Sequence, residues 1–262
     1  MTVSQANVFA RTLADRLRAT VAFALGVVAV AAVYVSMYPP MADDMAVYAE
    51  SVPEVLAVLM GEIADPAGYL HATIFALLGV VLLVAAAATF GAAAIAGEEE
   101  AATLPVLFTL PISRLKVAVQ KLAGLVVAVT VLAVVLFAAV TALVVGLGIE
   151  VPVVDVAAGT LHLHAFALFA LGLAFGLGAA TGRRAPALAV TLGVVVAGYV
   201  LHGVAHMLDG FEALRWISPF YWSAGTEPVV NGPAWGWLAL LYTTAAVAAA
   251  AGIWRFTRRD LT

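Results

Sequence analysis

The sequence contains no cysteine in 262 residues, which excludes disulfide bonds, thiolate metal sites and cysteine nucleophiles. Charged residues are scarce as well, at 11% of the chain, whereas a soluble domain has about 25%. The phosphate-binding pattern G-x-x-x-x-G-K-[ST] is also missing. Any hydrolysis of ATP linked to this chain would therefore have to take place on another subunit.

Apolar residues are correspondingly abundant. Hydrophobic residues make up 65% of the sequence, and the mean hydropathy is +1.09. This surplus cannot all be hidden in one core, so the lipid of a bilayer is the expected solvent. A helix needs about 20 apolar residues to cross the hydrocarbon. Six stretches qualify, namely 19–38, 69–96, 122–148, 159–181, 185–208 and 234–254. The predicted fold class is an all-α integral membrane protein, a single domain over 1–262 with six transmembrane helices.

The distribution of positive charge predicts the orientation, because Lys and Arg concentrate in cytoplasmic segments. Eleven of the 12 cationic residues fall on one side of the six spans, and only Arg215 falls on the other. Eleven of the 16 carboxylates lie on that opposite side. We therefore expect a multi-pass protein of the plasma membrane with both termini in the cytoplasm and external loops at 39–68 and 209–233. The five tryptophans are expected at the two interfaces, where amphipathic rings settle.

The middle of each predicted span carries no Asp, Glu, Lys or Arg. Ion-coupled transporters and proton pumps usually need such groups there, so the sequence argues against both. An intramembrane protease is a weak alternative, since Ser36 is the only serine in a predicted span and no G-x-S-x-G pattern surrounds it. We expect that this chain is not an enzyme, and we assign it no catalytic residue.

The longest cytoplasmic segment, 97–121, combines acid, apolar and basic residues in order. Glu98, Glu99 and Glu100 are expected to open a short helix with an apolar face that includes Leu104 and Leu107. The helix could instead begin near the proline at position 105, and the proline at position 111 would end it. An amphipathic helix held between two spans suits docking on a soluble protein, although a solvated charge run fits the residues equally well.

The next span is expected to begin at the end of this segment. Ser113 can cap its helix, and Arg114, Lys116 and Lys121 would carry positive charge up to the membrane face. At the other end of the chain, the residues before 19 place Phe9 and Leu17 on one face of a helix, so an interfacial helix is expected over 1–18.

Three groups of residues together resemble the permeases of type-2 ATP-binding-cassette transporters. They are Glu99 and Glu100 followed by Thr103 and Leu104, then "LPISR" at 110–114 with Lys121, and finally "ISPFYW" at 217–222 with the terminal "FTRRDL" at 256–261. The six-span topology with both ends inside is similar too and covers nearly the whole chain. One departure is Ala102, which stands where the family usually has glycine.

The resemblance implies a function, a partner and a docking site. It implies the permease of an ATP-driven exporter that pairs with a second copy or a paralogue and binds a separate ATPase subunit. ATP and Mg would sit on that partner, with no cofactor in this chain, and no nucleic-acid partner is expected. The docking residues would be Glu98, Glu99, Glu100, Leu104, Leu107 and Arg114. The sequence leaves the transported substrate open, and a membrane anchor that recruits a cytoplasmic factor without transport is the alternative.

The five histidines all fall in the external half of the predicted topology. His202 and His206 are four residues apart and share a helix face, so they are weak candidates for a metal site. His162 and His164 are two apart and cannot face one point on a regular helix. The commoner interpretation of all five is that of ordinary interfacial residues.

Overall fold

A computed structural model describes residues 8–49, 65–103, 112–207 and 211–259, and every regular element in these ranges is helical. The long elements are α1 (Val8–Ala49), α7 (Arg114–Gly146), α8 (Val153–Thr181), α9 (Arg184–Met207) and α12 (Trp235–Arg258). A sixth span is built from α3 (Pro66–Leu70), the π-helices η1 (His71–Leu78) and η2 (Val80–Val84), and α4 (Ala85–Ala94). Short elements are α5 (Ala96–Glu100), η3 (Glu212–Ile217), α10 (Pro219–Ser223) and α11 (Pro228–Asn231).

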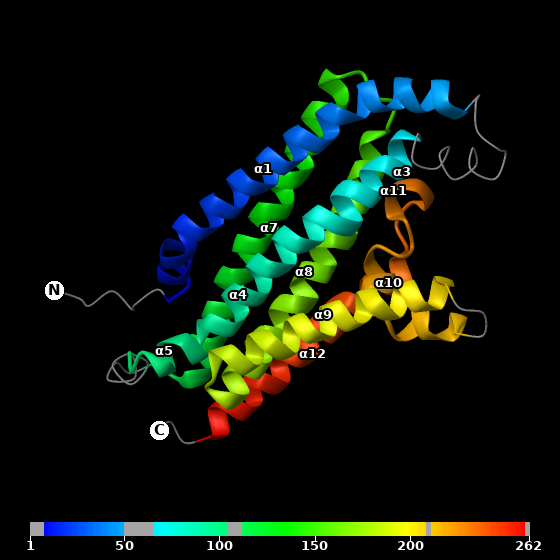
Figure 1. The fold of residues 1–262 in the computed structure, drawn as a ribbon. Helices are drawn as coiled ribbons and strands as arrows, with labels where there is room; N and C mark the ends of the chain where they lie inside the picture. Colours follow the sequence, from blue (N-terminus) through cyan, green and yellow to red (C-terminus); the bar gives the residue numbers. More distant parts are fainter. Residues whose placement is uncertain (1–7, 50–64, 104–111, 208–210, 260–262) are drawn as a thin grey trace.

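Within the described ranges six helices are long and apolar enough to cross a membrane, which confirms the predicted fold class. Three of the six begin and end within four residues of the predicted stretches, and two more match them apart from added turns at 114–121 and 153–158. The spans run side by side in an elongated bundle, with both ends of the described chain at the same end (Figure 1). We call this the basic end, because Arg18, Lys116, Arg183 and Arg255 lie near it, and we call the opposite one the far end.

The first span differs from its prediction at both ends. α1 is one continuous helix of 42 residues, so the described part of the expected interfacial helix (8–18) is joined to the span without a break. Its first turns pack on α7, where a Cβ at Gly124 would lie 3.2 Å from Thr12. At its other end α1 continues through Pro39 and Pro40 into the predicted external loop. The helix changes direction toward that end (Figure 1), as expected where proline removes intrahelical hydrogen bonds.

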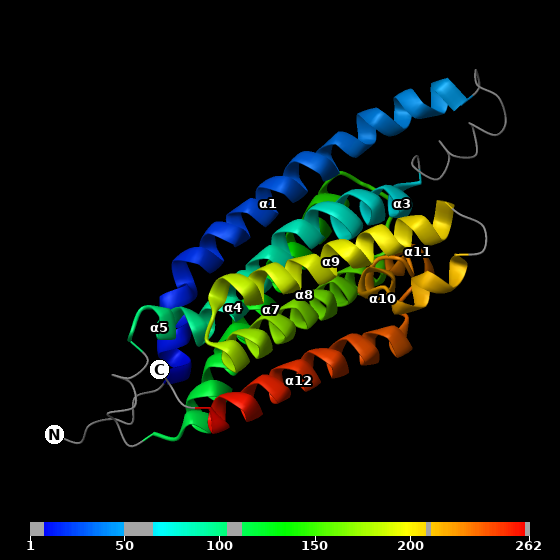
Figure 2. The same ribbon diagram turned by 60° about the horizontal axis from the view of Figure 1, so that its bottom comes forward.

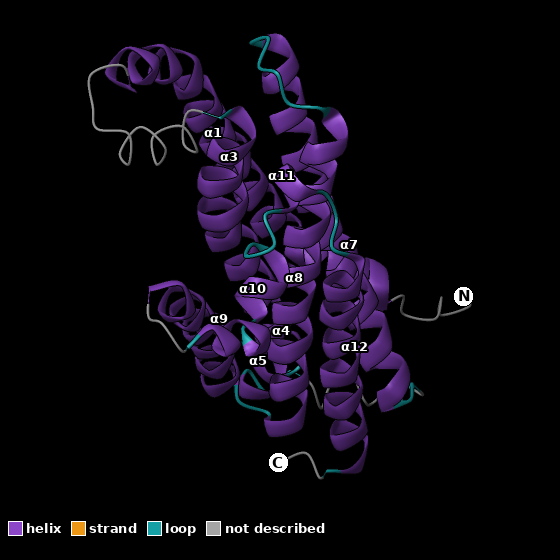
Figure 3. Cartoon of the chain, turned by 90° about the vertical axis from the view of Figure 1, so that its right-hand side faces the viewer, coloured by secondary structure: helices purple, strands orange, loops and turns teal. Residues whose placement is uncertain are grey.

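α8 forms the centre of the bundle and packs against α4, α7, α9 and α12 (Figures 2 and 3). Its backbone approaches α12 closely because glycine stands at the contacts. A Cβ at Gly172 would lie 2.3 Å from the carbonyl oxygen of Ala245, and one at Gly176 would lie 2.3 Å from that of Ala248. Small residues four apart on a helix allow such close approach of two backbones, and the structure identifies α12 as the partner.

The "ISPFYW" motif forms a helix start at the far end. Oγ of Ser218 accepts a hydrogen bond from the backbone N–H of Tyr221 (3.1 Å) and donates one to the carbonyl of Gly198 (2.6 Å), which ties α10 to α9. Three of the five tryptophans pack together here, with the rings of Trp222 and Trp237 stacked at 6.2 Å. The other two, at 235 and 254, are mostly exposed, as an interfacial position requires.

Several threonines within the helices share one arrangement. Each donates its hydroxyl proton to the carbonyl oxygen four residues earlier in its own helix. The threonines concerned include 12, 73, 130, 160, 191 and 244. A hydroxyl satisfied in this way can lie in hydrocarbon without a polar neighbour on another helix.

Replacement of Gly176 by alanine should destabilise the protein, because the new methyl group would collide with the α12 backbone. The expected cost is about 1–3 kcal/mol, as for other overpacked interiors. Thermal unfolding of the purified protein in detergent measures it. The matched control is Gly193→Ala in α9, where nothing lies within 4 Å of a new Cβ and alanine should be neutral or stabilising. Equal melting temperatures for the two variants would contradict the close α8–α12 contact.

Candidate functional site

The three consecutive glutamates lie at the basic end in α5, which follows α4 after a bend at Ile95. α5 ends at Glu100, and its end carries both hydrogen bonds of a Schellman motif. The N–H of Thr103 donates to the carbonyl of Glu98 (2.9 Å), and that of Ala102 donates to the carbonyl of Glu99 (3.0 Å). Ala102 has φ +53°, in the left-handed region. The structure thus differs from the prediction, because the glutamates lie at the end of the short helix α5 and do not open the short helix that was expected to include Leu104 and Leu107.

Glu99 and Arg259 form a buried ion pair that joins α5 to the end of α12. Their side chains keep only 10% and 13% of their surface exposed. Both guanidinium NH₂ groups donate to the two carboxylate oxygens, one at 2.7 Å, and Nε donates to the carbonyl of Ala179 at the end of α8 (3.0 Å). Gly182 leaves the necessary room, since a Cβ there would lie 2.8 Å from the Glu99 carboxyl group.

The two neighbouring glutamates contact two further helices. The carboxylate of Glu98 pairs with Nζ of Lys121 in α7, whose side chain is 6% exposed. Glu100, on the exposed side of α5, accepts a hydrogen bond from the backbone N–H of Arg184 at the start of α9 (2.8 Å). The three carboxylates together hold α5 against α7, α8, α9 and α12. We call these three glutamates with Lys121, Arg184 and Arg259 the glutamate cluster.

The segment that follows α5 is fixed at its other end as well. Ser113 caps α7, as predicted, with its Oγ accepting from the N–H of Lys116 (3.3 Å). Next to it, Nη1 of Arg114 donates to the backbone carbonyl of Arg259 (2.7 Å). Both ends of 101–113 are therefore anchored to the same cluster. Leu104 and Leu107, the predicted apolar docking residues, lie outside the described residues.

The glutamate cluster unites residues that sequence reasoning had treated separately. Glu98, Glu99, Glu100 and Arg114 were predicted to face an ATPase, and the structure gives each a partner within the chain. Their docking role stays a prediction. Sequence reasoning missed Arg259 as the partner of Glu99, 160 residues away in the chain. The signal that could have found it is that the "EE" motif and the terminal "FTRRDL" both contribute to the family resemblance and both lie on the predicted cytoplasmic side.

The histidines serve the packing of the far half of the bundle. His162 is 1% exposed, and its Nε2 accepts a hydrogen bond from the N–H of Ala234, the residue before α12 (3.0 Å). The ring of His202 packs on that of Phe220, with centroids 5.3 Å apart. Among the described residues no group of three or more His, Asp or Glu side chains is placed to hold a metal ion. The side chain of His206 is outside the described part, so the suggested pair with His202 is untested.

Glu99→Gln should unfold at a markedly lower temperature than the wild type in detergent, because it leaves the buried Arg259 guanidinium without a counter-charge. Removing one partner of a buried pair costs about 3 kcal/mol or more. The double exchange Glu99→Arg with Arg259→Glu should recover part of the loss. Glu150→Gln, at an exposed position of the far end, is the control and should leave the melting temperature unchanged. A Glu99→Gln protein as stable as this control would rule out the ion pair.

Ala102→Gly should raise the melting temperature in the same assay. Left-handed backbone costs a residue with a Cβ about 1 kcal/mol that glycine avoids. The neighbour Ala101 has φ −83°, so Ala101→Gly gains nothing in the folded state and should lower stability through the flexibility of its unfolded chain. If both glycine variants were destabilising, the left-handed conformation at 102 would be wrong.

The sequence comparisons agree with this architecture. The profile of the ABC-2 family transporter proteins matches residues 6–261, which is nearly the whole chain. A comparison with curated proteins finds no match. The matched region contains every member of the glutamate cluster and all six apolar helices. The chain therefore belongs to the ABC-2 transporter family, as a multi-pass membrane subunit.

Proposed function

We propose that the chain is the permease of an ABC exporter in the plasma membrane, with both termini and the glutamate cluster in the cytoplasm. A separate ATPase subunit, which carries ATP and Mg, docks on the segment 97–121. The permease pairs with a second copy or with a paralogue. These details go beyond family membership, which by itself gives a membrane subunit of a transporter that works with ATPase partners.

The observation that carries the proposal is the double anchoring of the segment 101–113. One end is held by the Schellman motif and by the Glu99–Arg259 pair, and the other by the cap at Ser113 and the bond from Arg114. A partner that moved this segment would therefore act on α5 and α7 directly. Through Arg259, Ala179 and Arg184 the movement would reach α12, α8 and α9.

This geometry divides the predicted docking residues into two roles. Glu98 and Glu99 hold α5 in place, since their carboxylates are engaged by Lys121 and Arg259. The contact with the ATPase is then left to the exposed residues after Glu100 and to the leucines at 104 and 107, whose apolar side chains would fill a groove on the partner. An amphipathic segment that lays its apolar side chains into a hydrophobic groove is a recurring mode of recognition between proteins.

The paired change Leu104→Glu and Leu107→Glu should abolish co-purification of the ATPase and leave the melting temperature of the permease unchanged. The assay is gentle detergent extraction from native membranes, followed by identification and ATPase measurement of the bound protein. The matched control is Ile217→Glu with Val230→Glu, two exposed apolar residues of the far end (62% and 49%). Glu99→Gln alone is unsuitable, because it would weaken the fold and the docking together.

Full retention of the ATPase by the leucine variant, or its loss from the control, would contradict docking on 97–121. A bound partner without ATPase activity would instead support the anchor function.

A further inference from the structure

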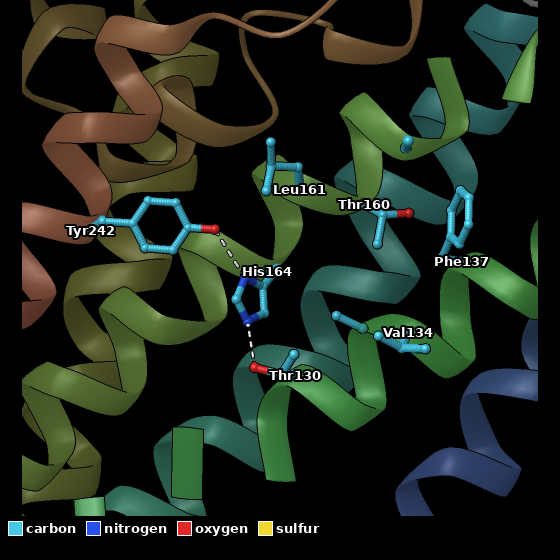
Figure 4. Close-up of a pocket in the computed structure, with 9 residues that line it drawn as sticks. Thr130, Val134, Phe137, Thr160, Leu161, His164 and Tyr242 are labelled. Carbon is cyan, nitrogen blue, oxygen red and sulfur yellow. Dashed lines mark hydrogen bonds between the residues drawn. The ribbon is translucent and has the colours of Figure 1, made fainter. Parts of the chain in front are cut away.

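A pocket of about 360 Å³ lies between α7, α8 and α12, and it falls within the size range of small-molecule sites (Figure 4). Its walls are apolar apart from four side chains, which belong to Thr130, Thr160, His164 and Tyr242. Val134, at its edge, keeps 58% of its surface exposed, so the pocket opens on the outside of the bundle. Because α7 is a span, that outside is the hydrocarbon of the membrane.

His164 lies deeper than the sequence indicated. The predicted span began at residue 159, but α8 begins at Val153, and His164 is therefore about 16 Å along the helix. Its ring connects two other helices, as the dashed lines in Figure 4 show. Nδ1 lies 2.9 Å from the hydroxyl of Tyr242 in α12, and Nε2 lies 3.0 Å from Oγ1 of Thr130 in α7.

The proton positions on the three hydrogen-bonded side chains, Thr130, His164 and Tyr242, can be assigned. Thr130 donates to the carbonyl of Val126 (2.8 Å), so it must accept from Nε2–H of His164. Nδ1 of the neutral ring is then an acceptor, and Tyr242 donates to it. In the opposite arrangement Thr130 would donate to Nε2, and Nδ1–H of His164 would donate to Tyr242. Thr130 would then lose its bond to Val126 and the Tyr242 proton would lose its acceptor Nδ1, so the three groups would make one hydrogen bond fewer.

Among the described residues that line the pocket, this assignment leaves hydrogen-bond acceptors and no free donor. The protons of Tyr242, His164 and Thr130 are engaged, and Thr160 donates to the carbonyl of Val156 (2.8 Å). The hydroxyl oxygens keep lone pairs. A ligand that donates a hydrogen bond therefore adds one to the existing set. A ligand that can only accept a hydrogen bond requires the direction of the bonds between Thr130, His164 and Tyr242 to reverse. The bond that it forms then only replaces the one that the reversal removes.

The remaining properties of the ligand follow from the walls. No Asp, Glu, Lys or Arg is among the described residues that line the pocket, so an ionised group would lie unpaired in low dielectric. A second, apolar pocket of about 190 Å³ shares Tyr242 as a wall and continues along α8 past Gly172 to Ala249 in α12. The two together suit an uncharged molecule with a long apolar body and one polar group near Tyr242.

We propose that this pocket binds an uncharged, membrane-dissolved alcohol, a lipid whose hydroxyl group donates to the oxygens around Tyr242 and His164. The ligand enters sideways from the hydrocarbon past Val134, and its apolar body fills the two pockets. This site is independent of the docking of an ATPase, because none of its residues belongs to the glutamate cluster.

The test uses two photoreactive probes that differ in whether their oxygen carries a proton or a methyl group. These are hexadecanol with a diazirine in its chain and the methyl ether of the same compound, each added to the full-length protein in lipid nanodiscs. After illumination, mass spectrometry should find the alcohol on peptides around 130–137, 157–164 and 242. Labelling by the ether should be roughly two- to tenfold weaker, the equivalent of one net hydrogen bond.

Variants of the protein distinguish the contribution of hydrogen bonding from that of the space in the pocket. Ala157→Phe, which fills the pocket from its wall, should abolish labelling of these peptides. Tyr242→Phe should keep the preference for the alcohol, because it frees Nδ1 of His164 as an acceptor. The variant that combines His164→Phe and Tyr242→Phe with Thr130→Val and Thr160→Val removes all four polar side chains named above, and it should lose that preference. Thr244→Val, which removes a hydroxyl that lines neither pocket, is the control and should behave as the wild type.

Equal labelling by the alcohol and the ether would overturn the proposal, as would undiminished labelling of Ala157→Phe. The pocket could also be covered by a second copy of the chain. Since the protein has no cysteine, Val134→Cys places a single thiol at the edge of the pocket. Efficient formation of a disulfide-linked dimer through it would show that a protein surface, and not a lipid, occupies the site.

Discussion

The close approach of α8 to its neighbours is the constraint on which the bundle depends. In a bilayer the lipid is as apolar as leucine, so burial of apolar surface does little to bring helices together. The gain must come from contact between well-fitted backbones. Glycines at 172 and 176 allow this against α12, and Gly91 allows it against α8 from the side of α4, where a Cβ would lie 2.7 Å from the carbonyl of Leu171. With α8 in the middle, the other spans occupy the positions that remain.

Charged side chains fix the arrangement of the helices at the basic end of the bundle. The end of α8, the start of α9 and the end of α12 come together at the basic end, where the glutamates of α5 meet Lys121, Arg184 and Arg259. Lys121 is buried and the Glu99–Arg259 pair keeps little exposed surface, and the desolvation of such groups is large. A bidentate pair with a further bond to the Ala179 carbonyl compensates for it through geometry. The arrangement is therefore specific, because a small displacement of α5 would leave charges buried without partners.

Sequence reasoning predicted the six spans because hydropathy and length determine transmembrane helices directly. It also predicted the cap at Ser113, whose signal is local. It failed where the signal in the sequence was weak or distant. α5 stops at Glu100 because Ala102 takes a left-handed conformation, which alanine rarely adopts. The interfacial position expected for 1–18 stays a prediction. The pairing of Glu99 with Arg259 depends on the folded bundle, so neither residue's own surroundings in the sequence could reveal it.

The threonines that bond within their own helices have a mechanical consequence. A helix whose hydroxyl groups are satisfied internally can shift along its neighbour without breaking a hydrogen bond between the two, and the shift changes dispersion contacts only. Translation of one span past another is then opposed by the shape of the contact surface, which rises and falls with each turn of the helix. The glutamate cluster resists such movement at one end. The spans are therefore tied to one another at particular places, such as the glutamate cluster and the bonds of His164 to Thr130 and Tyr242, while threonines bonded only within their own helix add no resistance to sliding.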